Sequence, residues 1–367
     1  METKVMRLAG LASILCLLLV SGGCGERKVE ERKEKVTDLL GRQVEVAIPA
    51  KRIVAIGPGT LRLVCYLQAA SKVVGVEDAE KRWQPFEGRP YLLANPQLRD
   101  LPVIGSGGPG SNPDPERLAL VRPDVVFATY LLDRGQADQL QQKARVPVVV
   151  LSYGELSTFS AEVEESILLL GKLIGEEKRA AEVVGYMKRC FEDLSRRVKD
   201  IPVSAKPRIY VGGLGARGSH GIESTQAKFP PLVALRAKNV ADESGREGSV
   251  MVDREKLLQW DPEVIVLDEV ALPLILSDYK KNPDFYRRLR AVKEGRVYGQ
   301  LPFNYYATNI ENTLANAYWL GSLLYPRAFR DVDPVRKAEE IYSFLLGRPL
   351  YQDVARAYGG FKKVEFK

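Results

Sequence analysis

Two short segments of the chain share one pattern of hydrophobic and polar positions. Residues 114–127 read DPERLALVRPDVVF, and residues 253–266, which read DREKLLQWDPEVIV, align with them without a gap. In each copy an Asp suited to capping a helix is followed by Glu in the first turn, where the helix dipole favours negative charge. A Pro then ends the short helix, and an apolar run typical of a buried strand follows. A helix leading into a buried strand, present twice, predicts two similar α/β lobes.

The residues around the first copy predict the remainder of one lobe. Residues 37–50 have the pattern of a β-hairpin that turns at Gly41-Arg42. A tight turn at residues 57–60 precedes a helix at residues 61–69, in which apolar residues recur at helical spacing. Because that turn follows a buried strand, it lies where α/β sheets place ligands. The strands expected in this lobe are residues 53–56, 73–76, 101–105 and 147–151.

A helical segment separates the two lobes. Residues 158–200 are strongly helical in pattern, with breaks at Gly171 and Gly175, and we expect residues 176–199 to cross between the lobes. The second lobe repeats the logic of the first, and residues 303–326 predict a late helix of about four turns that starts with polar and aromatic residues. The other elements expected there are strands at 208–211, 264–267 and 296–298 and a helix near 231–237.

The start of the chain differs in composition from the rest. Lys4 and Arg7 precede the apolar run LAGLASILCLLLV and the small residues SGG, a signal-peptide pattern with too few apolar residues for a membrane span. Cys24 follows directly and resembles the modified cysteine of a lipobox, although Ser21 stands where that pattern prefers Leu. We therefore expect a lipid on Cys24 that anchors the protein outside the cytoplasm, at the periplasmic or outer face of the membrane. Ordinary cleavage beside an incidental Cys is the alternative.

Length and composition complete the division of the chain. Its 367 residues, 45% hydrophobic and 28% charged, suit a soluble globular protein of two ordinary domains. The charged residues 25–35, GERKVEERKEK, lack periodicity and predict a flexible tether. The expected segments are a lipoprotein signal peptide at 1–23, a tether at 24–36, an N-terminal lobe at 37–157, a helical connector at 158–200 and a C-terminal lobe with late helices at 201–367.

Cysteine usage and charge exclude several classes of protein. Apart from Cys16 and Cys24, the chain has Cys65 and Cys190, which lie in apolar helical surroundings and are expected to be buried free thiols. The net charge of +7 suits an anionic ligand or an acidic membrane surface. No dense Lys/Arg block is interleaved with aromatic residues, so we expect no nucleic-acid partner.

One glycine-rich loop matches a nucleotide-binding pattern only in its letters. Residues 105–110 read GSGGPG, as the dinucleotide motif requires, but Pro109 and Pro113 prolong the loop where that motif needs a helix. We interpret this segment, which includes Ser106, as a loop that lines a cleft. The chain also lacks the longer phosphate-binding loop GxxxxGK[ST].

The only histidine lies in a second glycine-rich loop, GGLGARGSHG at residues 212–221. A single His nearly excludes His-rich metal cages and most general-base chemistry, and no nucleophile elbow is present, so we expect neither an enzyme nor a bound cofactor. Beside Arg217 and Ser219, the imidazole of His220 suits a chelated metal or an anion. The alternative is a surface His that contacts no ligand.

Aromatic and polar side chains lie near predicted strand ends. Asn304, Tyr305 and Tyr306 open the late helix, Tyr130 ends the strand of the first repeat copy, and Trp83 lies in an irregular stretch. Aromatic rings that face a cleft stack on planar ligands, and tyrosines also offer phenolic oxygens. The alternative is that some of these rings only pack the lobes.

Taken together, these motifs resemble the helical-backbone substrate-binding proteins of ABC importers, which bind iron siderophores, haem or cobalamin. The resemblance extends from Thr37 to about Tyr325. It rests on TDxxGRxV from Thr37, KRIVAIGPG from Lys51, VVGV from Val73, PERL and RPDVV in the first repeat copy, and AVKEGRVY from Ala291.

The resemblance implies an α/β fold of two Rossmann-like lobes with central parallel sheets, joined by a single long helix, with a ligand cleft between them. It also implies a monomer that passes its ligand to an ABC permease dimer with ATPase subunits. In this family one surface Glu of each lobe docks onto Arg residues of the permease, and Glu116 and Glu255 match those positions. Plain first-turn charges are the alternative for both.

The ligand implied by the resemblance is an iron complex, either a ferric siderophore or a haem-like chelate. The alternative is a molybdate or tungstate oxyanion, which relatives with a similar late helix and LYP tail bind, and for which backbone amides of residues 57–60 and 213–219 would be donors. An exported enzyme or sensor on the same fold is less favoured. His220 is expected to reach a metal only through the chelate. The expected ligand-binding residues are Gly57, Pro58, Gly59, Thr60, Trp83, Ser106, Tyr130, Arg217, Ser219, His220, Asn304, Tyr305 and Tyr306.

Overall fold

The computed structural model describes residues 32–366, apart from 109–110, 132, 155–159 and 216–217. The described residues belong to one compact unit. The expected signal peptide, Cys24, most of the tether and Arg217 lie outside the described residues. Within the described part of the chain, no helix has the length and apolar character needed to span a membrane.

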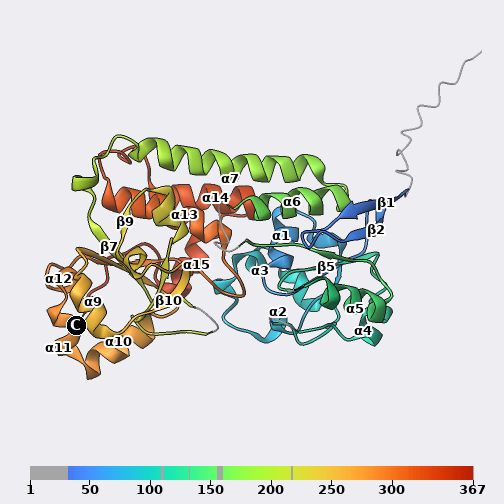
Figure 1. Ribbon diagram of the computed structural model, residues 1–367, viewed down its shortest axis with the longest axis horizontal. Helices are drawn as coiled ribbons and strands as arrows, with labels where there is room; N and C mark the ends of the chain where they lie inside the picture. Colours follow the sequence, from blue (N-terminus) through green and yellow to red (C-terminus); the bar gives the residue numbers. More distant parts are fainter. Residues whose placement is uncertain (1–31, 109–110, 132, 155–159, 216–217, 367) are drawn as a thin grey trace, which may run out of the picture. The chain divides into compact units, whose positions relative to one another are not determined.

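Each lobe is built on a parallel sheet of four strands, and the two sheets share one topology. The strand order is β4-β3-β5-β6 in the first sheet and β9-β7-β11-β12 in the second. Numbered along the chain within each sheet, both orders read second, first, third, fourth, which confirms the expected α/β fold with two similar lobes (Figure 1). The strands are β3 (Ile53–Ile56), β4 (Val73–Gly75), β5 (Val125–Ala128), β6 (Val148–Val150), β7 (Arg208–Gly212), β9 (Lys238–Asn239), β11 (Val264–Asp268) and β12 (Val297–Gln300).

The repeated segment forms the helix that precedes the third strand of each sheet. These helices are α4 (Pro115–Val121) and α9 (Arg254–Trp260). The side chains of Asp114 and Asp253 accept hydrogen bonds from backbone amides of the first turn, as the sequence predicts. Such caps satisfy amides that have no partner within the helix, so each helix begins directly after its Asp.

The ends of these two helices are held in the same way. Arg52, which precedes β3, donates to the carbonyl of Val121 at 2.7 Å, and Arg208, which begins β7, donates to the carbonyl of Trp260 at 3.1 Å. Both arginines satisfy carbonyls that a helix leaves without partners at its last turn. The likeness of the lobes therefore extends to residues outside the repeated segment.

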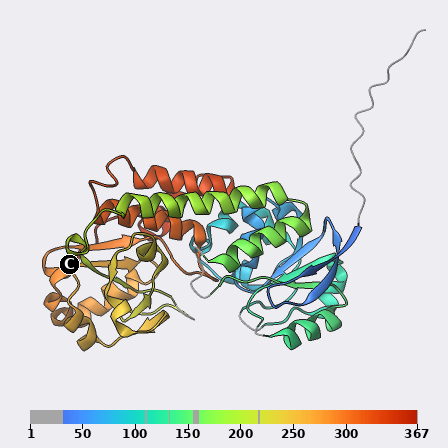
Figure 2. The ribbon, with the colours of Figure 1, turned by 45° about the horizontal axis from the view of Figure 1, so that its top comes forward.

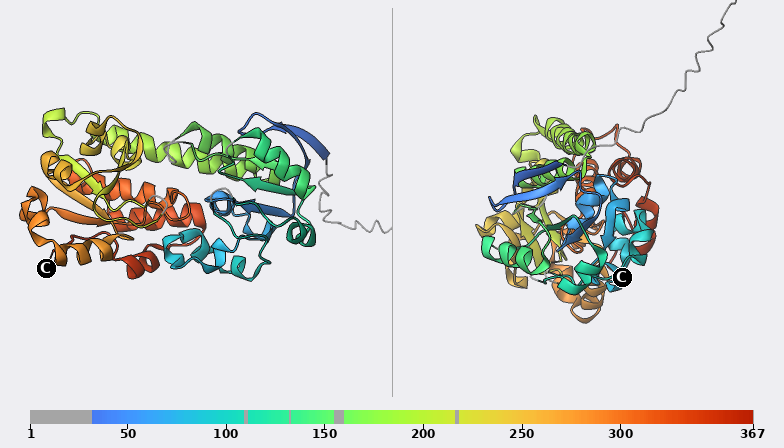
Figure 3. Two further views of the ribbon diagram at one scale, coloured as in Figure 1. Left: turned by 60° about the horizontal axis from the view of Figure 1, so that its bottom comes forward. Right: turned by 90° about the vertical axis from the view of Figure 1, so that its right-hand side faces the viewer.

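Helix α7 (Glu177–Val198) carries the chain from the first lobe to the second, as Figures 1 and 3 show. Near its start Arg179 donates to the carbonyl of Tyr66 in the first lobe at 3.0 Å, and near its end Ser195 donates to the carbonyl of Ala234 in the second lobe at 3.3 Å. Among the late helices, α13 packs against both α7 and α14 (Figure 2). The bounds of these neighbours are α6 (Ala161–Ile174), α13 (Ile310–Leu324), α14 (Pro334–Leu346) and α15 (Tyr351–Tyr358).

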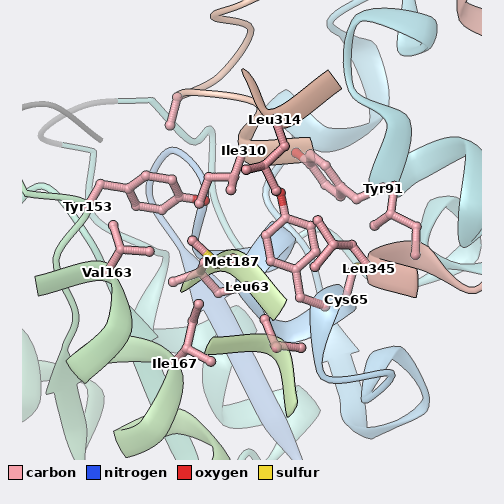
Figure 4. Close-up of a cluster of buried hydrophobic side chains, with 14 of the residues drawn as sticks. Leu63, Cys65, Tyr91, Tyr153, Val163, Ile167, Met187, Ile310, Leu314 and Leu345 are labelled. Atoms are coloured by element: carbon pink, nitrogen blue, oxygen red, sulfur yellow. The ribbon is translucent and has the colours of Figure 1, made fainter. Parts of the chain in front are cut away.

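One hydrophobic cluster extends from the first lobe through the long helices into the second lobe. Figure 4 shows part of it, in which Leu63 of α1 (Thr60–Tyr66), Met187 of α7 and Leu314 of α13 lie together. Cys65 and Cys190 are buried in this cluster as free thiols, which confirms that expectation. Replacing one buried Leu by Ala in such a cluster costs about 2–5 kcal/mol, so the shared core is what fixes the helices against the lobes.

The hairpin at the start of the described chain is longer than the sequence indicates. Strand β1 (Arg32–Thr37) pairs antiparallel with β2 (Gln43–Ile48), so residues 32–36 of the predicted tether form a strand. The interpretation as a tether is wrong there because the backbone of β1 pairs with that of β2 and Val36 is buried in the core with Val44 and Val46. The exposed pair of Lys33 and Glu45, 3.4 Å apart, adds little.

Two predicted elements of the sheets and late helices are shorter than expected. The strand predicted at residues 101–105 is only a single parallel bridge at Val103, because Pro102 has no amide to donate to a ladder. The late helix begins at Ile310 and not within residues 304–308, which form the turn described below.

The two glycines of the helical segment have different roles. Gly175 ends α6 with a left-handed backbone, as predicted, but Gly171 lies inside α6 and breaks nothing. A Cβ at Gly171 would lie 2.4 Å from the Cβ of Ala180, so glycine lets α6 and α7 approach closely. The remaining elements are α2 (Ala79–Arg82), α3 (Pro90–Ala94), α5 (Arg134–Ala144), α8 (Pro230–Ala234), α10 (Leu272–Lys281), α11 (Pro283–Arg288), α12 (Arg290–Lys293), β8 (Ser224–Ala227) and β10 (Gly248–Met251).

Candidate functional site

Between β12 and α13 the chain makes a tight turn at residues 304–308, here named the aromatic turn. Tyr306 and Ala307 have positive backbone φ angles of 57° and 70°. Across them the amide of Tyr305 donates to the carbonyl of Ala307 at 3.1 Å. Positive φ in residues other than glycine costs about 1–3 kcal/mol each and persists only where the surroundings hold it. Contacts to both lobes supply that support.

Tyr306 joins the aromatic turn to three segments of the first lobe. Its hydroxyl donates to Oε2 of Glu77 at 2.7 Å and accepts a hydrogen bond from the amide of Gly108 at 2.8 Å. Its ring lies edge-on to Trp83, with ring centroids 5.1 Å apart. Through Tyr306 alone, the turn at the end of the second sheet is therefore in contact with three segments of the first lobe.

Glu77, the acceptor of that bond, is a buried acid two residues after the end of β4. Its Oε2 also accepts from the amide of Gly57 at 3.0 Å. Burial raises the pKa of Glu77 to about 7, an effect that the bonds from Tyr306 and Gly57 oppose and the nearby Glu80 reinforces. Near neutral pH, therefore, both the charged and the neutral acid are populated.

The other side chains of the aromatic turn reach further segments of both lobes. The hydroxyl of Tyr305 donates to the carbonyl of Gln84 at 2.7 Å, and Nδ2 of Asn304 donates to the carbonyl of Gly215 at 3.0 Å. Gly215 belongs to the loop that holds His220, and Gly108 belongs to the loop that holds Ser106. The aromatic turn thus contacts both glycine-rich loops that the sequence singles out.

The loop at residues 57–60 is buried and bonded within the protein. The amides of Gly57 and Thr60 donate to Glu77 and to the Gly57 carbonyl, and the hydroxyl of Tyr153 donates to the carbonyl of Gly59 at 2.8 Å. Pro58 has no amide to offer. A Cβ at Gly59 would lie 2.5 Å from the Tyr153 ring, so glycine is required for this close contact.

In the second predicted set of amide donors, residues 213–219, some amides also donate hydrogen bonds within the protein. The amides of Gly213 and Leu214 both donate to the carbonyl of Ser224, at 2.9 and 3.3 Å. Together with Gly57 and Thr60, these amides hold the loops in shape, so they are not the donors that the oxyanion interpretation needs.

Trp83 and Tyr130 offer aromatic surface beside this network. Their side chains are 43% and 42% exposed, whereas Tyr306 is buried. Desolvation raises the pKa of the Tyr130 hydroxyl, and the nearby Arg62 partly opposes the shift. Exposed rings beside a buried polar network can stack on a planar ligand.

The remaining predicted residues are more peripheral. Ser106 and Ser219 are exposed and His220 is half-buried. Within the described ranges, no group of three or more His, Cys, Asp or Glu side chains is arranged to hold a metal ion. Ser106 lines a pocket of about 400 Å³ with Asp78, Arg82, Val103, Gly105, Asn112, Asp114 and Arg117.

Glu116 and Glu255 lie outside this network. Both are exposed and stand in the first turns of α4 and α9, at equivalent places in the two lobes. Their exposure leaves the carboxylates accessible to a partner protein.

Sequence reasoning missed three residues that build the site. Glu77 follows a predicted strand, where ligand-side groups of α/β sheets gather, and that position was its only signal. Arg62 interrupts an apolar helix, which marks a buried charge in need of partners. Tyr153 gave no signal, because its contact with Gly59 joins residues 94 positions apart.

Comparison with known proteins gives the same fold and several kinds of ligand. Residues 53–302 match the model of a family described as periplasmic binding protein. The molybdate-binding protein MolA of Haemophilus influenzae is 25% identical over 330 residues, covering 84% of this chain and 89% of its own. The iron-uptake system-binding protein of Bacillus subtilis is 23% identical over 311 residues, covering 78% and 88%.

Among solved structures, molybdate-bound MolA of Haemophilus influenzae superposes with a TM-score of 0.69 at 22% identity, covering 86% of this chain and 98% of that one. At this identity the likeness shows a common fold. MolA is the cognate molybdate periplasmic binding protein of an ABC transporter. The ligands named for the similar proteins differ, so the comparisons identify the fold and the class of protein but not the solute.

Proposed function

Because the chain belongs to the periplasmic binding protein family, we propose that it captures a small solute outside the cytoplasm and delivers it to an ABC permease dimer with its ATPase subunits. Two lobes of one topology, joined by α7 and bonded through the aromatic turn, support capture between the lobes. The exposed Glu116 and Glu255, one in each lobe, support docking onto arginines of the permease.

The solute that we propose is an iron complex, either a ferric siderophore or a haem-like chelate. The observation that carries this proposal is the pair of exposed rings, Trp83 and Tyr130, beside the buried network of Tyr306 and Glu77. Large chelates present flat organic surface, which aromatic side chains bind well. In this proposal His220 and Arg217 of the second glycine-rich loop contact the chelate from the second lobe.

A second candidate solute is molybdate or tungstate. A relative that covers most of this chain is a molybdate-binding protein, which favours an oxyanion. Against it stand the amides of Gly57, Thr60, Gly213 and Leu214, which already have acceptors within the protein. An oxyanion would have to use other donors of these loops or their neighbours.

The remaining parts of the proposal concern the molecule outside the site. We propose that Cys24 carries a lipid that anchors a monomer to the membrane, and that the protein is a receptor and not an enzyme. In the same proposal the connector of residues 158–200 separates lobes at 37–157 and 201–367. Mass spectrometry of the mature protein tests the anchor, because a free amino terminus at residue 24 without lipid contradicts it.

Titration of the purified protein tests the solute directly. Isothermal titration with a ferric catecholate siderophore, haemin and sodium molybdate is combined with visible absorbance of the iron complexes. We expect saturable binding of one iron complex per protein and no heat with molybdate. Binding of molybdate alone would overturn the iron proposal, and binding of none of the three would leave the receptor without a solute of either class.

A further inference from the structure

A fully buried arginine of the first lobe donates several hydrogen bonds to the aromatic turn. Arg62 of α1 has no exposed surface. Its Nη1 donates to the carbonyl of Thr308 at 2.8 Å, and its Nη2 donates to the carbonyl of Tyr305 at 3.1 Å and to Oδ1 of Asn309 at 2.6 Å. One guanidinium therefore binds both ends of the turn that carries Tyr306.

The charge of Arg62 is balanced within the same cluster. Its Nε lies 3.9 Å from Oε1 of Glu311, which is also fully buried, and the hydroxyl of Tyr66 donates to the other oxygen of Glu311. The guanidinium carbon lies 4.9 Å from the ring centroid of Tyr91. Burying two charges costs several kcal/mol in desolvation, which must be offset by bonds of good geometry. Nε of Arg62 and Oε1 of Glu311 have no hydrogen-bond partner within the described residues, so the guanidinium makes its short bonds through Nη1 and Nη2 to the turn and to Asn309.

The acceptors explain why the cation is an arginine. Two of them are backbone carbonyls, and they belong to a turn whose central residues have left-handed backbones. The planar fork of a guanidinium reaches several acceptors at once, whereas the single ammonium of a lysine does not. Without the fork, the aromatic turn loses the bonds that hold its strained backbone in place.

We propose that Arg62 is a positioning residue for the solute site: it fixes the aromatic turn so that Tyr306 and Trp83 meet in the arrangement that receives the ligand. Arg62 itself is too deeply buried to contact a solute. This inference rests on the proposed function, because the site that it positions is the one proposed to bind the iron complex.

The test uses two substitutions of Arg62 and a matched control. Arg62→Lys keeps the charge beside Glu311 and loses the fork, and Arg62→Met combined with Glu311→Gln removes both charges together. The control is Arg42→Lys. Arg42 is likewise a nearly buried arginine that donates to a carboxylate, Asp38, and to a carbonyl, Val148, but it lies in the hairpin turn of the first lobe.

Two readouts separate positioning from general stability. The first is the affinity for the ferric siderophore or haemin, measured by isothermal titration beside the melting temperature. The second needs no ligand: in protein labelled with 5-fluorotryptophan, the ¹⁹F resonance of Trp83, assigned with Trp83→Phe, reports the contact with Tyr306. Trp83 lies edge-on to that ring, so a displaced turn shifts its resonance.

We expect both Arg62 variants to bind the iron complex at least about tenfold more weakly, which corresponds to about 1.4 kcal/mol of binding free energy. We also expect the Trp83 resonance to shift or broaden in both variants. Arg42→Lys is expected to lower the melting temperature and to leave the affinity and the resonance unchanged. An unmoved Trp83 resonance in both Arg62 variants overturns the inference. If the wild-type protein binds neither iron complex, the proposed function fails, while the resonance still decides the role of Arg62.

Discussion

Glu77 is a buried acid whose charge bears on how the lobes are bonded. It accepts from Tyr306 of the aromatic turn and from the amide of Gly57, so it lies between the second lobe's turn and the first lobe's loop. Burial raises its pKa to about 7 against the usual value of 4.5. A carboxyl group in this state prefers its proton in the folded protein more than in the unfolded chain.

Glu77→Gln is expected to remove part of the pH dependence of folding. As the pH rises from about 4.5 to about 7, the unfolded chain loses the Glu77 proton while the folded protein retains it, so this contribution to stability is present at low pH and is lost through this range. The effect amounts to about 3 kcal/mol. Denaturant unfolding of both proteins at several pH values measures it.

The informative quantity is the difference in unfolding free energy between the wild-type protein and Glu77→Gln at each pH. Burial also raises the pKa of Asp268 to about 7 and that of Glu269 to about 8, and both groups titrate equally in wild type and variant. A wild-type and variant pair with parallel pH profiles would show that Glu77 titrates normally.

Tyr306→Phe tests the hydroxyl that links the lobes. The variant leaves the amide of Gly108 and the carboxyl of Glu77 without this partner, which is expected to cost about 1–3 kcal/mol of unfolding free energy. It should also weaken solute binding. Tyr325→Phe is the control, because the buried Tyr325 hydroxyl has no hydrogen-bond partner within the described residues. Equal stability of the two variants would contradict the role of Tyr306.

At the scale of secondary-structure elements, the repeated helices α4 and α9 explain why the lobes are alike. Each has an Asp cap at its start, and an arginine at or just before the first residue of a strand binds a carbonyl at its end. Local signals of this kind are readable from the sequence, since cap, helix and proline are close together along the chain. The buried strands were readable for the same reason.

Asp114→Ala and Asp253→Ala are expected to have nearly the same effect. Each removes one helix cap and should lower the free energy of unfolding by about 1 kcal/mol. Thermal and denaturant unfolding measure both. The control is Asp284→Ala, since that side chain is 96% exposed and should change stability by less than about 0.5 kcal/mol. A cost confined to one lobe would show that the two caps are not equivalent.

The elements that the sequence did not predict depend on distant partners. The sequence predicts that residues 304–308 begin α13, because nothing local to them indicates that Arg62, 243 or more positions away, binds their carbonyls. The sequence predicts a flexible tether for residues 32–36, since their partners in β2 lie outside a short window. Tertiary contacts decided both.

At the scale of the whole molecule, the fold places the two lobes on one set of helices with a shared core. Several polar bonds between the lobes converge on the aromatic turn. The surface carboxylates Glu116 and Glu255 lie instead on the repeated helices. In the proposed function, solute capture and permease docking use different residues, so mutations are expected to separate them.

Glu116→Ala combined with Glu255→Ala is expected to abolish import while leaving solute affinity unchanged. Loss of the carboxylates removes the charge pairs with the permease arginines, and neither residue contacts the aromatic turn. Uptake of labelled solute into cells and isothermal titration of the purified variant measure the two properties. Glu177→Ala with Glu192→Ala, on the exposed side of α7, is the control and should import normally. An equal fall in affinity would refute the docking assignment.

The central claim is that an iron complex binds at the aromatic rings beside the aromatic turn. Its most direct test is titration of a double variant, Trp83→Ala with Tyr130→Ala. Isothermal titration compares it with the wild-type protein, using a ferric catecholate siderophore and haemin. We predict that the wild-type protein binds one of these complexes and that the variant binds it at least about tenfold more weakly, as expected for the loss of two stacking side chains. Equal affinity of the two proteins for that complex would contradict the account.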